Sequence, residues 1–202
     1  MTSKDFADAA SVDEAKIPVI DVSGAINGDD LEGVARAIFS AATDHGFFYI
    51  SNHGIDQSLI EQAFGVSKSF FDLPKSDKGT IAVNTDQRGW MATGMSTLQA
   101  AGLQVKTKSH GWIEAPPIEG TLVCNIGDLL ARWSNGRFAS TVHRVINRTN
   151  SARYSIPVFF DPHTDAVVDP IDLGVERKDS LYRARHRWSA YIWAKQEKLR
   201  PV

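Results

Sequence analysis

The sequence predicts an α+β fold in which two amphipathic helices lie in the first half of the chain and most of the strands lie in the second. Apolar residues recur at helical spacing in two segments before residue 72. Short runs of β-branched and aromatic residues, bounded by turn-forming residues, follow from residue 102 onward. A length of 202 residues with 43% hydrophobic content is enough for one sizeable domain with its own core.

The chain begins with a polar arm and continues as a strand and a helix. Residues 1–16 are polar, alanine-rich and acidic, so we expect a mobile arm. Ile17–Val22 predicts a short strand. Gly28-Asp29-Asp30 offers a cap for a helix that ends at His45-Gly46. The apolar positions of this helix are Leu31, Val34, Ala35, Ile38, Phe39 and Ala42.

A second strand and a second helix follow. Phe47–Ser51 has the composition of a buried strand, and His53 comes next in a tight Asn-His-Gly turn. Taken alone, His53 is either a metal ligand or part of the turn. Asp56 can cap a helix that runs through Phe71, and Leu73-Pro74 is expected to end it.

The second half predicts three short strands and a C-terminal helix. The strands are expected at 103–106, 111–113 and 121–125, and Leu129–Trp133 forms a short apolar bridge. Residues 171–202 are expected to form a C-terminal helix, because charged residues alternate there with Tyr and Trp. The basic run within it would suit RNA, but a solvated helix face is the favoured interpretation.

Composition limits the classes of partner. The net charge is −2, so no basic footprint predicts a nucleic-acid partner. No stretch has the length of a membrane span, and the first residues lack the apolar core of a secretory signal, so no membrane partner is expected. Cys124 is the single cysteine and lies in an apolar run, which predicts a buried, inert thiol in a reducing, cytoplasmic setting.

The stretch from Ser140 to Asp161 predicts a β-hairpin around a polar turn. If the two strands pair symmetrically about Thr149, His143 lies opposite Ser155, and Val145 opposite Arg153. His143, Arg153 and Ser155 then project from one face of the sheet. A shift of one residue would separate His143 from the other two.

These three side chains suit a 2-oxo acid. Imidazole is a common ligand of iron and other transition metals. A guanidinium binds a carboxylate through two parallel hydrogen bonds, and a serine hydroxyl can add a third. The alternative is a surface hairpin in which the histidine and the arginine have no role.

Several motifs in one order resemble the isopenicillin N synthase-like, 2-oxoglutarate- and Fe(II)-dependent dioxygenases. They are Ile17–Asp21, Gly46–Gly54, Arg88-Gly89-Trp90, Gly102–Lys106, Trp112–Pro117, Asn125–Asp128, His143 and Arg153-Tyr154-Ser155. The resemblance implies a double-stranded β-helix (jelly roll) with N-terminal helices and an oxidoreductase that acts on a small molecule. It implies Fe(II) at His143, 2-oxoglutarate at Arg153 and Ser155, and a structural role for His53.

The sequence departs from this family between two regions, 17–99 and 100–170. After Gln99, Ala100-Ala101 leads directly into Gly102, where relatives carry a long segment that includes the H-x-D motif and two of the three iron ligands. We therefore expect an incomplete jelly-roll core, an impaired enzyme, and self-association through exposed sheet edges.

Three hypotheses stay open at this point. The chain could descend from a working oxygenase and have lost its activity, or it could be a non-catalytic remnant that binds 2-oxoglutarate or a protein. It could also be active with His163 and Asp165, the H-x-D pair that follows Pro162, as substitute ligands. His110 is a further substitute but falls in an expected hairpin turn.

Overall fold

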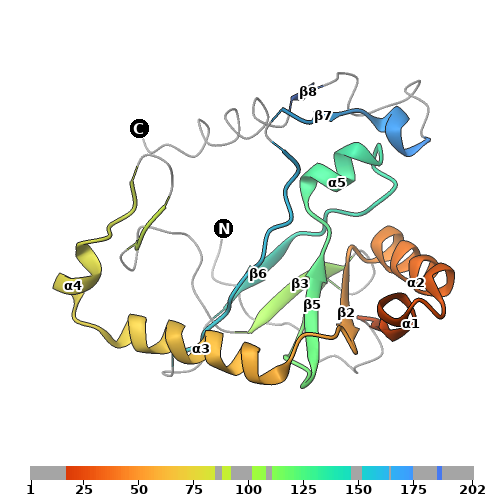
Figure 1. The fold of residues 1–202 in the computed structure, drawn as a ribbon. Coiled ribbons are helices and arrows are strands. Elements are labelled where there is room, and N and C mark those ends of the chain that lie inside the picture. The colour runs from red at the N-terminus through yellow and green to blue at the C-terminus, as the bar shows by residue number, and fades with distance from the viewer. Residues whose placement is uncertain are drawn as a thin grey trace. The chain divides into compact units, whose positions relative to one another are not determined.

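The computed structural model describes residues 17–84, 88–91, 102–107, 111–146, 152–163, 165–174 and 186–187 (Figure 1). Its elements in chain order are β1 (Val19–Asp21), α1 (Ser23–Asn27), α2 (Leu31–Asp44), β2 (Phe47–Ser51), α3 (Gln57–Asp72), α4 (Lys75–Gly79), β3 (Leu103–Thr107), β4 (Gly111–Glu114), β5 (Thr121–Asn125), α5 (Asp128–Trp133), β6 (His143–Val145), β7 (Val167–Val168), the 3-10 helix η3 (Pro170–Leu173) and β8 (His186–Arg187).

The chain divides into two compact units, each built from separate stretches of sequence. One contains the described residues of 52–121 and 142–157, and therefore α3, α4 and the sheet β4-β3-β6. The other contains those of 17–51, 122–141 and 158 onward, with α1, α2, α5 and the sheets β1-β2-β5 and β7-β8. The arm at 1–16, the join at 99–101 and His110 lie outside the described residues.

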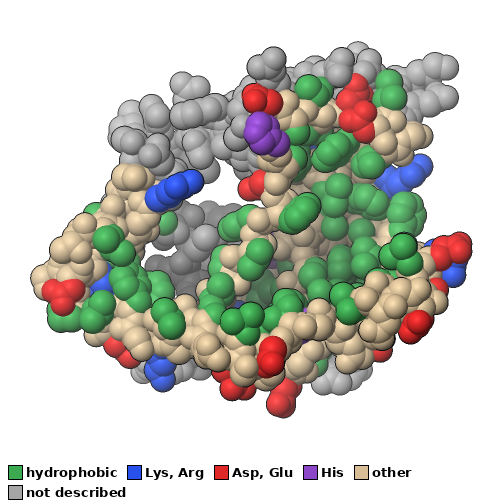
Figure 2. Space-filling model, in the orientation of Figure 1, with side chains coloured by type: hydrophobic (Ala, Val, Ile, Leu, Met, Phe, Trp, Pro, Cys, Tyr) green, Lys and Arg blue, Asp and Glu red, His purple; other side chains and the backbone are tan. Residues whose placement is uncertain are grey.

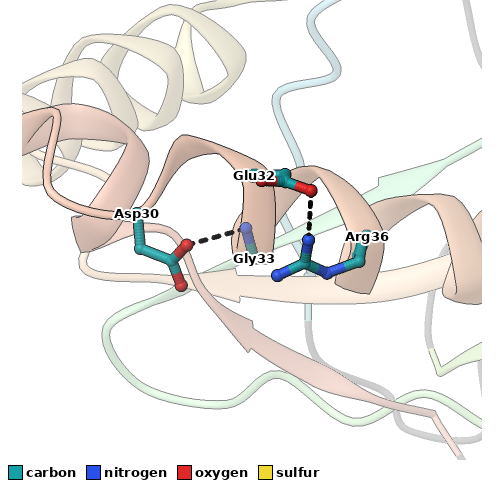
Figure 3. Close-up of polar contacts among 4 residues, drawn as sticks. All are labelled: Asp30, Glu32, Gly33 and Arg36. Atoms are coloured by element: carbon teal, nitrogen blue, oxygen red, sulfur yellow. Dashed lines mark hydrogen bonds and ion pairs between the residues drawn. The ribbon is translucent and has the colours of Figure 1, made fainter.

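In the second unit, α2 packs against the sheet β1-β2-β5. β1 pairs with β2 in parallel, with Val19 opposite Tyr49. The core is apolar and comprises Ile20, Val22, Val34, Ala41, Ala42, Phe48 and Ile126. Asp30 begins the helix as predicted, because its side chain accepts a hydrogen bond of 2.8 Å from Gly33 N, and Glu32 pairs with Arg36 one turn later (Figure 3).

Gly46 ends α2 at a point where no side chain fits. Its φ is +66°, and a Cβ there would lie 1.9 Å from the carbonyl oxygen of Ala139. The same neighbourhood is joined by backbone hydrogen bonds from Ala139 N to Ala42 O and from Ile126 N to Gly46 O. The predicted glycine stop is confirmed, and its reason is close backbone approach as well as conformation.

In the first unit, α3 begins and ends where the sequence predicted. Asp56 accepts from Ser58 N at 2.7 Å, and the helix stops at Leu73 before Pro74. None of its residues is buried, although it is amphipathic, and Leu59, Val66 and Phe71 are among its exposed apolar side chains. Along α3, hydrophobic side chains are visible on the surface among polar and backbone atoms (Figure 2).

The sheet β4-β3-β6 is antiparallel, and β3 is its central strand. Val105 of β3 lies opposite both Ile113 of β4 and His143 of β6. Val105 and Ile113 are fully buried. β6 is an edge strand of this sheet, so its position depends on β3 alone among the described strands.

Three local predictions were wrong. Residues 153–160 form no strand, so the hairpin register that placed Ser155 opposite His143 is not formed; β6 pairs with β3 instead. His186–Arg187 form strand β8 against β7, which contradicts a continuous helix over 171–202. Leu129–Trp133 was read as an apolar bridge but belongs to the short helix α5. In the described part of the chain, no helix is both long and apolar enough to cross a membrane.

Candidate functional site

His143 lies on the short edge strand β6. It shares the sheet face of Val105, which it directly opposes, and its side chain is exposed. Two backbone hydrogen bonds hold the strand ends to β3, from Lys106 N to Val142 O at 2.9 Å and from Ile146 N to Gly102 O at 3.2 Å. The sheet therefore presents His143 at its rim.

The opposite face of the same sheet carries a cluster that sequence reasoning missed. Arg144 stacks on Trp112, and its Nε donates to Gln104 Oε1, which leaves Gln104 only 1% exposed. Lys106 Nζ lies 5.9 Å from the centre of the same Trp112 ring. Gln104 and Lys106 are two residues apart on one predicted strand, and Trp112 and Arg144 lie on two other predicted strands. Residues two apart share a sheet face, and this spacing was a signal for the cluster.

Arg153 and Ser155 flank Tyr154 in a segment that forms no helix or strand. Both are exposed, whereas Tyr154 between them is half-buried. The centre of the Tyr154 ring lies 6.2 Å from that of Phe71 on α3, with the rings tilted by 52°. Arg153 makes no ion pair with any residue that the structure describes, so its guanidinium is available to an external anion.

His163 and Asp165 belong to the other unit and interact with each other. Asp165 N donates to His163 Nδ1 at 3.3 Å, and Asp165 Oδ2 lies 3.9 Å from the same nitrogen. Both side chains are exposed. Because Nδ1 accepts a hydrogen bond, the neutral ring of His163 carries its proton on Nε2, and neither nitrogen offers a free lone pair to a metal unless this hydrogen bond is given up.

The described side chains do not fit a complete iron site. A non-haem Fe(II) centre of this kind needs two histidines and one carboxylate around one metal position. Across the ranges that the structure describes, no three His, Cys, Asp or Glu residues are grouped closely enough to hold a metal ion. His143 is thus a single candidate ligand.

His53 and Cys124 lie in surroundings that fit a structural role. His53 Nδ1 accepts a hydrogen bond of 3.2 Å from Ile55 N, within a turn in which Asn52 and Gly54 have positive φ. Cys124 is half-buried, and burial raises the pKa of its thiol, which fits the predicted inert cysteine.

A groove with a volume of about 580 Å³ lies between β1 and α2. Its floor is apolar, with Val34 and Ala41, and Asp21, Asp30 and Asp44 line it as well. None of the predicted site residues lines this groove, so its position gives no support to a binding role for them.

Comparison with known proteins agrees with the motifs. Residues 17–116 match the family described as the N-terminal region of the non-haem dioxygenase in morphine synthesis. A homoarginine-6-hydroxylase of Glycine max is 50% identical over 70 residues, which are 35% of this chain and 21% of the relative. A 1-aminocyclopropane-1-carboxylate oxidase of Solanum lycopersicum is 32% identical over 142 residues, which are 65% of this chain and 44% of the relative. The chain spans less than half the length of these curated relatives.

Solved structures share the fold. A full-length Neurospora crassa protein crystallised in complex with alpha-KG has a TM-score of 0.77 at 23% identity, over 93% of this chain and 99% of that one. A 2OG-Fe(II) oxygenase family protein of Caulobacter crescentus has a TM-score of 0.78 at 18% identity, over 92% and 99%. The expected jelly-roll class with N-terminal helices is therefore confirmed. Its motifs, its relatives and its fold together establish that the chain belongs to the 2-oxoglutarate- and Fe(II)-dependent dioxygenase family.

Proposed function

We propose that this chain descends from a 2-oxoglutarate- and Fe(II)-dependent oxygenase of small molecules and keeps the carboxylate clamp of that site without a complete set of iron ligands. The observation that carries the proposal is the alternation at Arg153-Tyr154-Ser155. Two hydrogen-bonding side chains are exposed, and the residue between them packs against α3. A guanidinium and a hydroxyl in that arrangement suit a carboxylate.

The proposed iron site is incomplete because His143 is the one family ligand that the sequence retains. His143 is held on the sheet edge, and we propose it as the surviving iron ligand of the family. The proposed loss of a central segment between Gln99 and Gly102 accounts for the absence of an H-x-D motif before Gly102 and for the short span of the chain relative to its relatives. His163 and Asp165 are weaker substitutes, because their contact with each other occupies Nδ1.

The small-molecule substrate and the cofactor are supported by what similar proteins bind. The Neurospora crassa protein was crystallised with alpha-KG and thymine, and another similar structure, JOX2, holds 2OG, Fe and JA. We propose 2-oxoglutarate as the ligand of Arg153 and Ser155 in this chain, and a cytoplasmic location, which suits a lone reduced cysteine.

A second function is a non-catalytic remnant that binds a protein. The observation in its favour is the exposed apolar segment that follows Ser155, in which Val158 is 88% exposed, Phe159 81% and Phe160 100%. Exposed apolar residues and an open sheet edge each favour association with another chain, including a second copy.

Calorimetric titration with 2-oxoglutarate tests the clamp. Arg153→Gln should weaken binding by up to about fivefold, since an exposed ion pair contributes roughly 0.2–1 kcal/mol. Arg153→Lys should recover part of this loss because lysine keeps the charge but lacks the planar fork. Lys75→Gln removes another exposed cation of the same unit and serves as the control. Equal affinity of the wild type and Arg153→Gln would overturn the clamp.

A further inference from the structure

The segment that carries the proposed clamp is held in an unusual way. Residues 152–160 belong to no strand, and no hydrogen bond joins them to another part of the chain that the structure describes. A ring contact that joins them to a helix is that of Tyr154 with Phe71. The orientation of Arg153 and Ser155 is therefore tied to a side chain of α3 and not to a β-ladder.

Phe71 is itself well supported. Its ring also packs edge-on against Phe70, with 5.3 Å between the ring centres. Lys78 Nζ donates to the Phe71 carbonyl oxygen, and Lys78 is only 9% exposed because it lies beneath the Trp90 ring, 5.8 Å from its centre. The last turn of α3 is thereby joined to Lys78 of α4.

The loop that supplies Trp90 is also constrained. Trp90 N donates to Ile81 O at 2.7 Å, and Val83 N donates to Trp90 O at 2.9 Å. Gly89 has a φ of +126°, and a Cβ there would lie 2.5 Å from the Ile81 carbonyl oxygen. A line of contacts thus runs from the Arg-Gly-Trp motif through Lys78 and Phe71 to Tyr154.

We propose that Phe71 is a positioning residue for Arg153 and Ser155. In an extended segment, successive side chains point to opposite sides. A Tyr154 ring held on α3 keeps both of its neighbours turned away from the helix, toward an incoming carboxylate. This inference rests on the proposed 2-oxoglutarate clamp. Without the ring contact, the segment samples other orientations. The apparent affinity is then the intrinsic affinity multiplied by the fraction of molecules in which the segment is oriented to bind.

The test compares two ligands in calorimetric titrations. 2-Oxoglutarate has a far carboxylate for the clamp, whereas 2-oxobutyrate has the keto acid end and lacks that carboxylate. Phe71→Ala and Tyr154→Ala should each weaken 2-oxoglutarate binding about fivefold and leave 2-oxobutyrate binding unchanged. Phe71→Tyr and Tyr154→Phe keep an aromatic ring and should restore the wild-type affinity.

The controls separate positioning from folding and from the clamp itself. Phe64→Ala removes another exposed aromatic side chain of α3 and should change neither titration. Wild-type affinity in Phe71→Ala, alongside weakened binding in Arg153→Gln, would overturn the positioning role and leave the clamp intact. Wild-type affinity in both variants would overturn the clamp as well. An equal loss for both ligands in Phe71→Ala would indicate a general structural effect and also overturn the inference.

Discussion

The guanidinium carbon of Arg144 lies 4.0 Å from the centre of the Trp112 ring, and Arg144 Nε donates to Gln104 Oε1 at 2.9 Å. These contacts bridge β6, β3 and β4 on the face opposite His143. Because β6 has only three residues and one neighbouring strand, the side chains of this cluster add substantially to the backbone pairing that holds it. The stability of β6, which carries His143, thus depends on the neighbouring residue Arg144.

Arg144→Met should destabilise the protein by about 1–3 kcal/mol, because it leaves the buried Gln104 acceptor without its donor and removes the cation–π contact. Urea unfolding followed by circular dichroism measures the change. Lys106→Met is the matched control, since Lys106 is exposed and its amine lies farther from Trp112. The cluster would have no stabilising role if both variants unfolded at the same urea concentration.

Metal binding should be weak. One histidine provides too few ligands for a tight site, since affinity depends on ligand number and geometry. Titration with Co(II), or with Fe(II) under argon, should show no stoichiometric micromolar site, and succinate formation from 2-oxoglutarate should not exceed that of His143→Ala. A micromolar site abolished by His143→Ala would contradict this expectation, and its loss in His163→Ala as well would revive the substitute H-x-D pair.

Asp30→Ala should lower the free energy of unfolding by about 1 kcal/mol, because the helix α2 loses the acceptor for Gly33 N. Asp30→Asn keeps an oxygen acceptor and should cost less. Thermal unfolding of the three proteins gives the comparison. The cap would be energetically unimportant if Asp30→Ala melted at the wild-type temperature.

The cap of α3 should add a pH dependence. Hydrogen bonds from Ser58 hold the pKa of Asp56 below its ordinary value of 3.8. The folded state therefore binds this proton less readily than the unfolded state, so the stabilisation is present above about pH 4 and is lost as the pH falls through the folded pKa. Asp56→Ala should destabilise the protein more at pH 7 than at pH 3. An equal effect at both values would exclude the ionised cap.

Cys124 should react slowly with thiol reagents. Burial raises the pKa of its thiol, so little thiolate is present at pH 8. Ellman's reagent should label the native protein more slowly than the protein in 6 M guanidinium chloride, in which the side chain is exposed. Equal rates under the two conditions would show that the thiol is accessible in the native state.

Local signals predicted the two long helices well, whereas the short helices α1 and α4 were not predicted. Asp30 and Asp56 marked the starts of α2 and α3, while Gly46 and Pro74 marked their ends, because capping and chain reversal are determined within a few neighbouring residues. The strand β2 was predicted over its whole length, Phe47–Ser51, from its uninterrupted apolar composition.

The candidate site was predicted less completely. A shared orientation of Arg153 and Ser155 stays a prediction from parity along the chain, whereas their pairing with His143 depended on which strand lies beside β6. Residues 153–160 have the composition of a strand, yet a strand forms only where a partner completes the ladder. The six-residue helix α5 is too short for its periodicity to be recognised.

The exposure of Val158, Phe159 and Phe160 has a consequence for the life of this protein in a cell. Chaperones and proteases act on apolar segments that a folded chain leaves accessible, and three such residues in succession form one. We expect the abundance of the protein to be set by quality control, with a short half-life that inhibition of the proteolytic machinery would extend. The rates of synthesis and degradation, and not ligand affinity, would then determine how much protein with the proposed carboxylate clamp is present in the cell.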